Sequence, residues 1–322
     1  MKYIKAEMHC HTTASDGSMQ PETLIRRACE RGYGAIASTD HNTTAAHARL
    51  RTEAAARGIT LIGGIEWTTF HGHLTVLGDT RVNWRDVMPQ TIDECLRRAD
   101  EDGAVVTAAH PFRMGNPLCT GCYFEYRPTT WEHIRGYEIY SGILPHKSVY
   151  SARAKARWIE LIRSGYRISA MYGYDWHHSD EHAPAYGATY LLVDDRASEA
   201  SCVRAVREGR TFVSVGICAD ICFRADGVRR ELGDTLDRGA VGVVEITARP
   251  DPIFARRRAV ELHAARIAAF DGTVEEYPFA GGKIEIPYTA RGAFRIEIVG
   301  SADGESGELL ITSPIYIKEK DV

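Results

Sequence analysis

The 322-residue sequence predicts an α/β protein in which a closed β/α barrel precedes a smaller domain of β-strands. Two observations support this fold class. Between Tyr3 and Val215, short apolar runs alternate with helix-like segments, as in repeated β/α units. Beyond Gly216 the long helices stop, and short strands are separated by Gly, Asp and Pro. Roughly seven strands suit a barrel better than an open sheet, although a doubly wound sheet has the same pattern.

The first helix shows the β/α pattern most fully. Pro21 suits the first turn of a helix, because its missing N–H has no partner there. An apolar stripe with helical spacing follows and stops at Gly32, and a strand comes next at 35–38. The same alternation predicts further strands and then helices, at 3–8, 59–65, 104–109, 136–140, 168–171, 188–193 and 211–215, and at 92–99, 148–164 and 198–208.

The C-terminal third has a different texture. The run from Phe294 to Val299 alternates apolar and polar residues, which indicates a half-buried antiparallel strand. We therefore expect a barrel over residues 1–215 and a small β-sandwich over residues 216–322. Strands are predicted at 242–247, 260–264, 283–287, 294–299 and 308–318.

Composition limits the function. Lys and Arg total 39 against 43 Asp and Glu, so the net charge of −4 argues against a broad cationic surface for duplex nucleic acid, although a single nucleotide remains possible. The sequence has no leader-like segment and no apolar run of about 18 residues, so we expect no membrane insertion and a cytoplasmic location. Eight cysteines in so long a chain do not form a dense disulfide pattern.

Histidines and acids gather near the predicted strand ends. His9 and His11 follow the first strand, and alternate side chains of an extended backbone share one side. Taken singly, each such residue is more often an ordinary surface or core-edge group. As a set they favour a common metal site, because barrel strands bring their carboxyl ends together. The set comprises His9, His11, Asp16, His41, Glu66, His73, His110, Asp175 and His177.

These motifs, taken in order, resemble those of the PHP (polymerase and histidinol phosphatase) family. The likeness covers residues 3 to 215 and implies a distorted (β/α)7, TIM-like barrel. A looser likeness, from residues 137–140 and the β domain, is to the branch with carbamate and aryl-ester hydrolases. The motifs are His9-Cys10-His11, Asp16-Gly17, Thr39-Asp40-His41, Gly64-Ile65-Glu66, Ala109-His110-Pro111 and Asp175-Trp176-His177.

The resemblance implies two or three divalent ions. Carried over residue by residue, it gives His9, His11, Glu66 and Asp175 to a first ion. It gives Glu66, His73 and His110 to a second, and Asp16, His41 and His177 to a third. His71 competes with His73 for its place in the second set. Asp16 differs from the family members that have a histidine at this turn, which leaves two ions as an alternative. Asp40 either orients a ring or has a structural role.

The ligand chemistry predicts a hydrolase. Imidazole and carboxylate without thiolate suit Zn, Mn or Fe. Ions bridged by Glu66 would share a water and lower its pKa, which gives a hydroxide nucleophile. Several cations also neutralise a phosphate group, so we expect hydrolysis of a small phosphomonoester or phosphodiester, including nucleotides. Glu66 and Asp175 organise the reaction in this hypothesis, and a metal-bound water, His41 or His177 protonates the leaving oxygen.

Substrate contacts and alternatives follow from the same site. Arg113 and Lys147 are candidates to hold a phosphate, against the common case of solvated cations. His178 and His182 could line the pocket, against exposed loop histidines. The alternative reaction is hydrolysis of a carboxylic or carbamic ester at the same centre, and the alternative of another class is a non-catalytic metal-binding module. The oligomeric state stays open.

Overall fold

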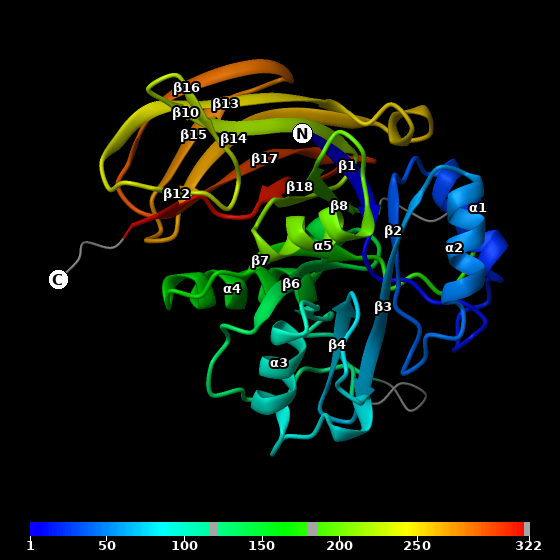
Figure 1. The fold of residues 1–322 in the computed structure, drawn as a ribbon. Helices are drawn as coiled ribbons and strands as arrows, with labels where there is room; N and C mark the ends of the chain where they lie inside the picture. The colour runs from blue at the N-terminus through cyan, green and yellow to red at the C-terminus, as the bar shows by residue number, and fades with distance from the viewer. Residues whose placement is uncertain (116–120, 180–185, 319–322) are drawn as a thin grey trace.

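The computed structural model describes residues 1–115, 121–179 and 186–318 (Figure 1). Its largest sheet has thirteen strands, in the order β15-β14-β17-β18-β9-β8-β1-β2-β3-β4-β5-β6-β7. The strands from the first part of the chain are β1 (Lys2–Glu7), β2 (Ala35–Ser38), β3 (Thr60–Thr69), β4 (Gly72–Leu77), β5 (Val105–Ala108), β6 (Ile134–Ser141), β7 (Ser169–Gly173), β8 (Ala188–Val193) and β9 (Thr211–Ser214).

Helices alternate with these strands, as predicted. Their bounds are α1 (Pro21–Glu30), α2 (His47–Ala56), α3 (Ile92–Glu101), α4 (Val149–Arg163) and α5 (Glu199–Arg207), with short 3-10 turns η1 (Trp84–Asp86), η2 (Pro145–Lys147) and η3 (Phe254–Arg256). The sequence did not predict α2. Only Leu50 and Ala54 are buried on this helix, which is too thin an apolar stripe to stand out.

The strand directions depart from a simple parallel barrel. Strands β1, β2 and β3 are parallel, as are β5, β6 and β7. Between them, β3 and β4 form an antiparallel hairpin, and β4 also pairs antiparallel with β5. The predicted strand end at residue 65 is therefore wrong, because pairing with β4 extends β3 to Thr69. Glu66 and His73 lie within the hairpin strands and not after a strand end.

In the large sheet, β7 lies at one end of the strands from the first part of the chain, and β8 and β9 lie at the other end. Side-chain hydrogen bonds join these two ends. The amide of Tyr172 in β7 donates to Thr189 Oγ1 in β8 at 2.8 Å, and the Thr189 hydroxyl donates to the Tyr172 carbonyl at 3.0 Å. Thr211 Oγ1 in β9 donates to the Ala170 carbonyl at 2.8 Å. Main-chain pairing does not join β7 to β8 in the part of the chain that the structure describes. The result is an α/β fold built on one large sheet.

The C-terminal strands are mainly antiparallel, as the alternation predicted. A four-stranded sheet has the order β11-β10-β13-β16, and β14, β15, β17 and β18 extend the large sheet through pairing of β18 with β9. Figure 1 shows these strands gathered at one side of the molecule, away from α1, α2 and α3. Their bounds are β10 (Ile217–Ala225), β11 (Val228–Arg230), β12 (Thr235–Leu236), β13 (Ala240–Pro250), β14 (Val260–Ala269), β15 (Val274–Pro278), β16 (Gly282–Ala290), β17 (Phe294–Ala302), β18 (Glu305–Thr312) and β19 (Tyr316–Ile317).

One hydrophobic core runs through both parts of the chain. It includes Trp158 from α4 and Phe294 from β17, both fully buried. A buried ion pair also joins the parts, because Lys5 Nζ lies 2.8 Å from Asp251 Oδ2. Within the described ranges, no helix has both the length and the apolar character needed to cross a membrane.

Candidate metal centre

Two distant motifs are held side by side by main-chain hydrogen bonds. The amide of His11 donates to the Trp176 carbonyl at 3.0 Å, and the amide of Trp176 donates to the His9 carbonyl at 3.1 Å. This short parallel bridge continues beyond the ends of β1 and β7. It brings His9 and His11 next to the residues on either side of Trp176, which are Asp175 and His177.

Glu66 lies at the centre of the cluster. The side chain is fully buried, and burial alone would raise the pKa of its carboxyl group. The surrounding imidazoles outweigh burial and hold that pKa well below its usual range. Nitrogen atoms of five histidines approach the Glu66 oxygens, from His9 at 3.3 Å, His11 at 3.6 Å, His41 at 2.7 Å, His73 at 3.1 Å and His110 at 3.3 Å.

Asp175 is a second carboxylate in contact with these imidazoles. Its Oδ1 lies 3.1 Å from His11 Nε2 and 3.5 Å from His9 Nε2, while the Arg113 guanidinium pairs with Oδ2. Asp175 and His110 both have a positive φ, of 57° and 28°. Non-glycine residues rarely adopt such angles, and the strained ones concentrate at functional sites.

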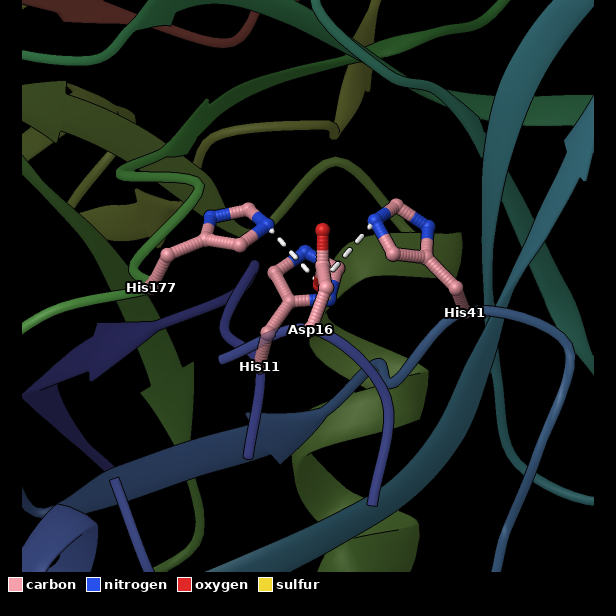
Figure 2. A group of neighbouring side chains, drawn as sticks. All are labelled: His11, Asp16, His41 and His177. Atoms are coloured by element: carbon pink, nitrogen blue, oxygen red, sulfur yellow. Dashed lines mark ion pairs between the residues drawn. The ribbon is translucent and has the colours of Figure 1, made fainter. Parts of the chain in front are cut away.

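A third group lies toward the open side of the cluster (Figure 2). His41 and His177 point at Asp16 from opposite sides, with His11 behind it. Asp16 Oδ1 lies 3.2 Å from His177 Nε2, 3.4 Å from His41 Nε2 and 3.9 Å from His11 Nδ1. Burial alone would lower the pKa of His41, but hydrogen bonds with Asp16 and Glu66 raise it to about 10.

These side chains suit metal ions. Four sets of donor atoms each lie within 4.8 Å of one another, and all are imidazole nitrogens or carboxylate oxygens. The buried nitrogens His9 Nε2, His11 Nδ1 and His73 Nε2 make no hydrogen bond in the described structure. A buried lone pair without a partner is costly, and a cation between these atoms and the acids would supply one. The sets are His9-His11-Glu66, His9-His110-Asp175, His41-Glu66-His73 and His11-Asp16-His41-His177.

The structure brings all nine predicted ligands together, but regroups two of them. His110 clusters with His9 and Asp175, and His41 clusters with Glu66 as well as with Asp16. His73 contacts Glu66, whereas the ring of its competitor His71 packs at 5.9 Å against Tyr126. Strand alternation alone would place His71 and His73 on the same face. They differ because His71 lies in the turn before β4, whereas His73 lies within β4.

A cavity of about 390 Å³ opens onto these groups. Arg113 and His178, the predicted substrate contacts, are both among its lining residues. Lys147, the other predicted phosphate contact, is not among the described residues that line this cavity. Because η2 packs against β18, Lys147 Nζ instead pairs with Glu305 Oε2 at 3.3 Å. His182 lies outside the described residues. The lining comprises Asp16, His41, His73, His110, Arg113, Met114, Cys122, Ile143, Tyr174, Asp175, His177 and His178.

Three buried acids support the cluster, and the sequence interpretation gave two of them, Glu7 and Glu138, no role at the metal site. Asp40 accepts hydrogen bonds from the Thr12 amide and the Ser15 hydroxyl, both at 2.7 Å, so it holds a loop and not an imidazole. Glu7 accepts from the amides of His9 and Tyr174, and burial raises its pKa to about 7. Glu138 contacts His9 directly at 2.8 Å. The sequence did offer one sign of a role for Glu138, because it is a single acid within a strand of apolar residues, and acids are seldom buried without a partner.

Comparison with known proteins gives a consistent result. Residues 7–106 match the family model of the PHP domain. Over 65 residues the chain is 49% identical to the 5'-3' exoribonuclease Rnm of Escherichia coli, which covers 20% of this chain and 22% of that protein. Over 70 residues it is 37% identical to a 3',5'-nucleoside bisphosphate phosphatase of Chromobacterium violaceum, covering 22% of this chain and 25% of that protein. The alignments thus span about a quarter or less of these curated relatives.

A solved structure resembles the whole chain. A two-domain protein from Bacteroides vulgatus, which contains a predicted PHP-like metal-dependent phosphoesterase, superposes with a TM-score of 0.57 and 16% identity. The match covers 98% of this chain and 95% of that one. At this identity, the likeness establishes a shared fold.

Proposed function

We propose that this chain, whose residues 7–106 match the family model of the PHP domain, is a metal-dependent hydrolase of small phosphate esters. The observation that carries the proposal is Glu66, a fully buried carboxylate contacted by five imidazoles. Three of these imidazoles, from His41, His73 and His110, line a cavity that the Arg113 guanidinium also lines. Three buried imidazole nitrogens of this cluster make no hydrogen bond, and burying apolar side chains in their place would cost less. A cation centre explains both their burial and their orientation.

The proposed ligands form overlapping sets that suit two or three divalent ions. His9, His11, Glu66 and Asp175 would hold the first ion, and Glu66, His73 and His110 the second. Asp16, His41 and His177 would hold a third on the open side. Divalent ions bound there would supply Lewis acidity, both to activate water and to neutralise phosphate charge. Zn, Mn and Fe all suit this donor set.

The remaining groups have separable tasks in the reaction. The Arg113 side chain, which pairs with Asp175 in this structure, would swing to a substrate phosphate. A bidentate contact there would fix the orientation of the phosphate. His41 and His177 line the cavity, and when no ion occupies the third set, Nε2 of either ring can pass a proton to the leaving oxygen. His178 contributes a further polar contact at the cavity edge. The cavity volume suits a nucleotide or a smaller ester.

A substrate panel tests this function. The purified chain, loaded in turn with Mn²⁺, Zn²⁺ or Fe²⁺, is assayed with p-nitrophenyl phosphate, nucleoside monophosphates, a phosphodiester and naphthyl carbamates. We expect phosphate ester cleavage that EDTA abolishes and that Asp175→Ala removes without unfolding the chain. Cleavage of carbamates alone would favour the alternative ester hydrolase. Activity that survives EDTA, or no cleavage of any compound, would contradict the proposal.

The finer fold assignment belongs to the same proposal. We infer that the strands of residues 1–215 curl into a distorted (β/α)7 barrel. The hydrogen bonds of Thr189 and Thr211, which join β8 and β9 to β7, would close this barrel. Residues 216–322 would then form a β-sandwich. Ring contacts between its sheets support this, since Phe294 of β17 lies 6.1 Å from Phe223 of β10 and 4.8 Å from Tyr288 of β16.

A further inference from the structure

Strand β6 supplies none of the proposed metal ligands, yet it directs one acid at the cluster. Glu138 is 2% exposed and uses both of its oxygens. Its Oε1 lies 2.8 Å from His9 Nδ1, and its Oε2 accepts the main-chain N–H of His110 at 2.7 Å. One carboxylate therefore contacts the ring of one proposed ligand and the backbone of another.

The local backbone is arranged around this carboxylate. Tyr137, Ile139 and Tyr140 all belong to the main hydrophobic core, and the pairing register of β6 with β7 shifts between Glu138 and Tyr140. Such a bulge changes which side a residue faces. It keeps Tyr140 in the core, where strict alternation would put Tyr140 on the same face as Glu138.

Space for the carboxylate comes from the facing strand. A Cβ at Gly173 of β7 would lie 2.2 Å from Glu138 Oε1 and 2.7 Å from His9 Cβ. Any side chain at residue 173 would therefore displace either the acid or the imidazole. The absence of a side chain at this position lets β6 and β7 present the acid to His9.

The contact fixes the protonation pattern of His9. A carboxylate oxygen can only accept, so Nδ1 must donate, and in the neutral ring the lone pair is then on Nε2. Nε2 is the atom that lies 3.3 Å from Glu66 and 3.5 Å from Asp175 without a hydrogen bond. Holding the His110 amide also braces a residue whose φ is 28°.

We propose that Glu138 is a positioning residue of the metal centre, which sets the tautomer and ring orientation of His9 and the backbone of His110. The inference rests on the metal centre of the proposed function, and does not depend on which ester is cleaved. Carboxylates that accept from metal-bound imidazoles raise the basicity of the ligand, and their loss weakens metal binding about 10- to 100-fold.

Metal affinity tests the assignment without any turnover measurement. The full chain is stripped with EDTA, and its Mn²⁺ and Zn²⁺ affinities are measured by chelator competition. Glu138→Ala should weaken binding of the first ion about 10- to 100-fold. Glu138→Gln should have a smaller effect, because its single oxygen can satisfy one of the two donors. Nitrogen-15 spectra of the histidine rings should also lose the hydrogen-bonded Nδ1 proton of His9 in the alanine variant.

Glu297→Gln is the matched control. Glu297 is 3% exposed and pairs with Arg295 at 2.8 Å and Lys155 at 3.1 Å, and it does not line the cavity. Its variant should keep wild-type metal affinity. If Glu138→Ala does not fold, Glu138→Gln decides the question. Wild-type affinity and an unchanged His9 signal in the folded Glu138 variants would overturn the inference.

The two proposals fail in different ways. A wild-type chain that binds Mn²⁺ but cleaves no phosphate ester would refute the proposed function, and weaker binding in Glu138→Ala would still support the positioning role. A wild-type chain that cleaves phosphate esters, with Glu138 variants that bind metal normally, would refute only the positioning role.

Discussion

Removing the charge of Glu66 should remove much of the stabilisation that metal ions give to the protein. An ion that binds only the folded chain stabilises it by about 2.7 kcal/mol at a 100-fold excess over Kd. With about 2.1 cal/mol/K of unfolding entropy per residue, 322 residues give about 0.7 kcal/mol/K. Each ion should therefore raise the melting temperature of one cooperative unit by about 4 °C.

Glu66→Gln keeps the size of the side chain and removes the charge that five imidazoles face. Two of the four donor sets contain Glu66, so the variant should lose at least the shift of one ion, about 4 °C. The assay is thermal unfolding with and without Mn²⁺ or Zn²⁺, and the quantity compared is the metal-dependent shift of each variant. Glu297→Gln, a buried acid elsewhere, should keep the full shift. An equal shift in Glu66→Gln and the wild type would refute the reasoning.

Three further outcomes follow from other contacts. Asp251→Ala leaves the buried Lys5 ammonium unpaired and should cost about 3–5 kcal/mol in urea unfolding, whereas a loss below about 1 kcal/mol would contradict the contact. Burial would raise the pKa of Asp100, but hydrogen bonds led by Arg135 lower it to about 2. A lowered folded pKa stabilises above the unfolded pKa of about 3.9, so the stability advantage over Asp100→Asn should fade as the pH drops from about 4 to 2, and a constant difference would contradict this. Arg113→Ala should raise KM for a phosphate ester about 10- to 100-fold with little change in melting temperature, and Arg113→Lys should raise it less; an unchanged KM would exclude the contact.

The sequence was most informative where local pattern decides structure. Residues 188–193 were predicted as a strand with the observed bounds, because a short, continuous apolar run between turn signals has few alternatives. Eight of the nine proposed ligands, all but His73, stand in ordered, compact motifs, and the structure brings all nine into one cluster. The antiparallel C-terminal strands followed from the alternation of apolar and polar residues.

Tertiary pairing decided what the sequence could not. Strand β3 runs past Glu66 because β4 supplies hydrogen-bond partners, which no local signal announces. Strand β10 was missed, since Asp220 and Arg224 interrupt its apolar residues. Lys147 was a candidate for a phosphate contact or a solvated cation, and the direction of its loop depends on packing against β18. The partner of Glu138 lies 129 residues away, so its contact with His9 is visible only in three dimensions.

Anomalous scattering from crystals grown with Mn²⁺ would locate the metal ions that we propose. We expect strong anomalous peaks within coordination distance of Glu66, His9 and Asp175, and a further peak beside Asp16 if the third set is filled. Peaks only at surface carboxylates, or none in this cluster at saturating Mn²⁺, would contradict a metal centre around Glu66.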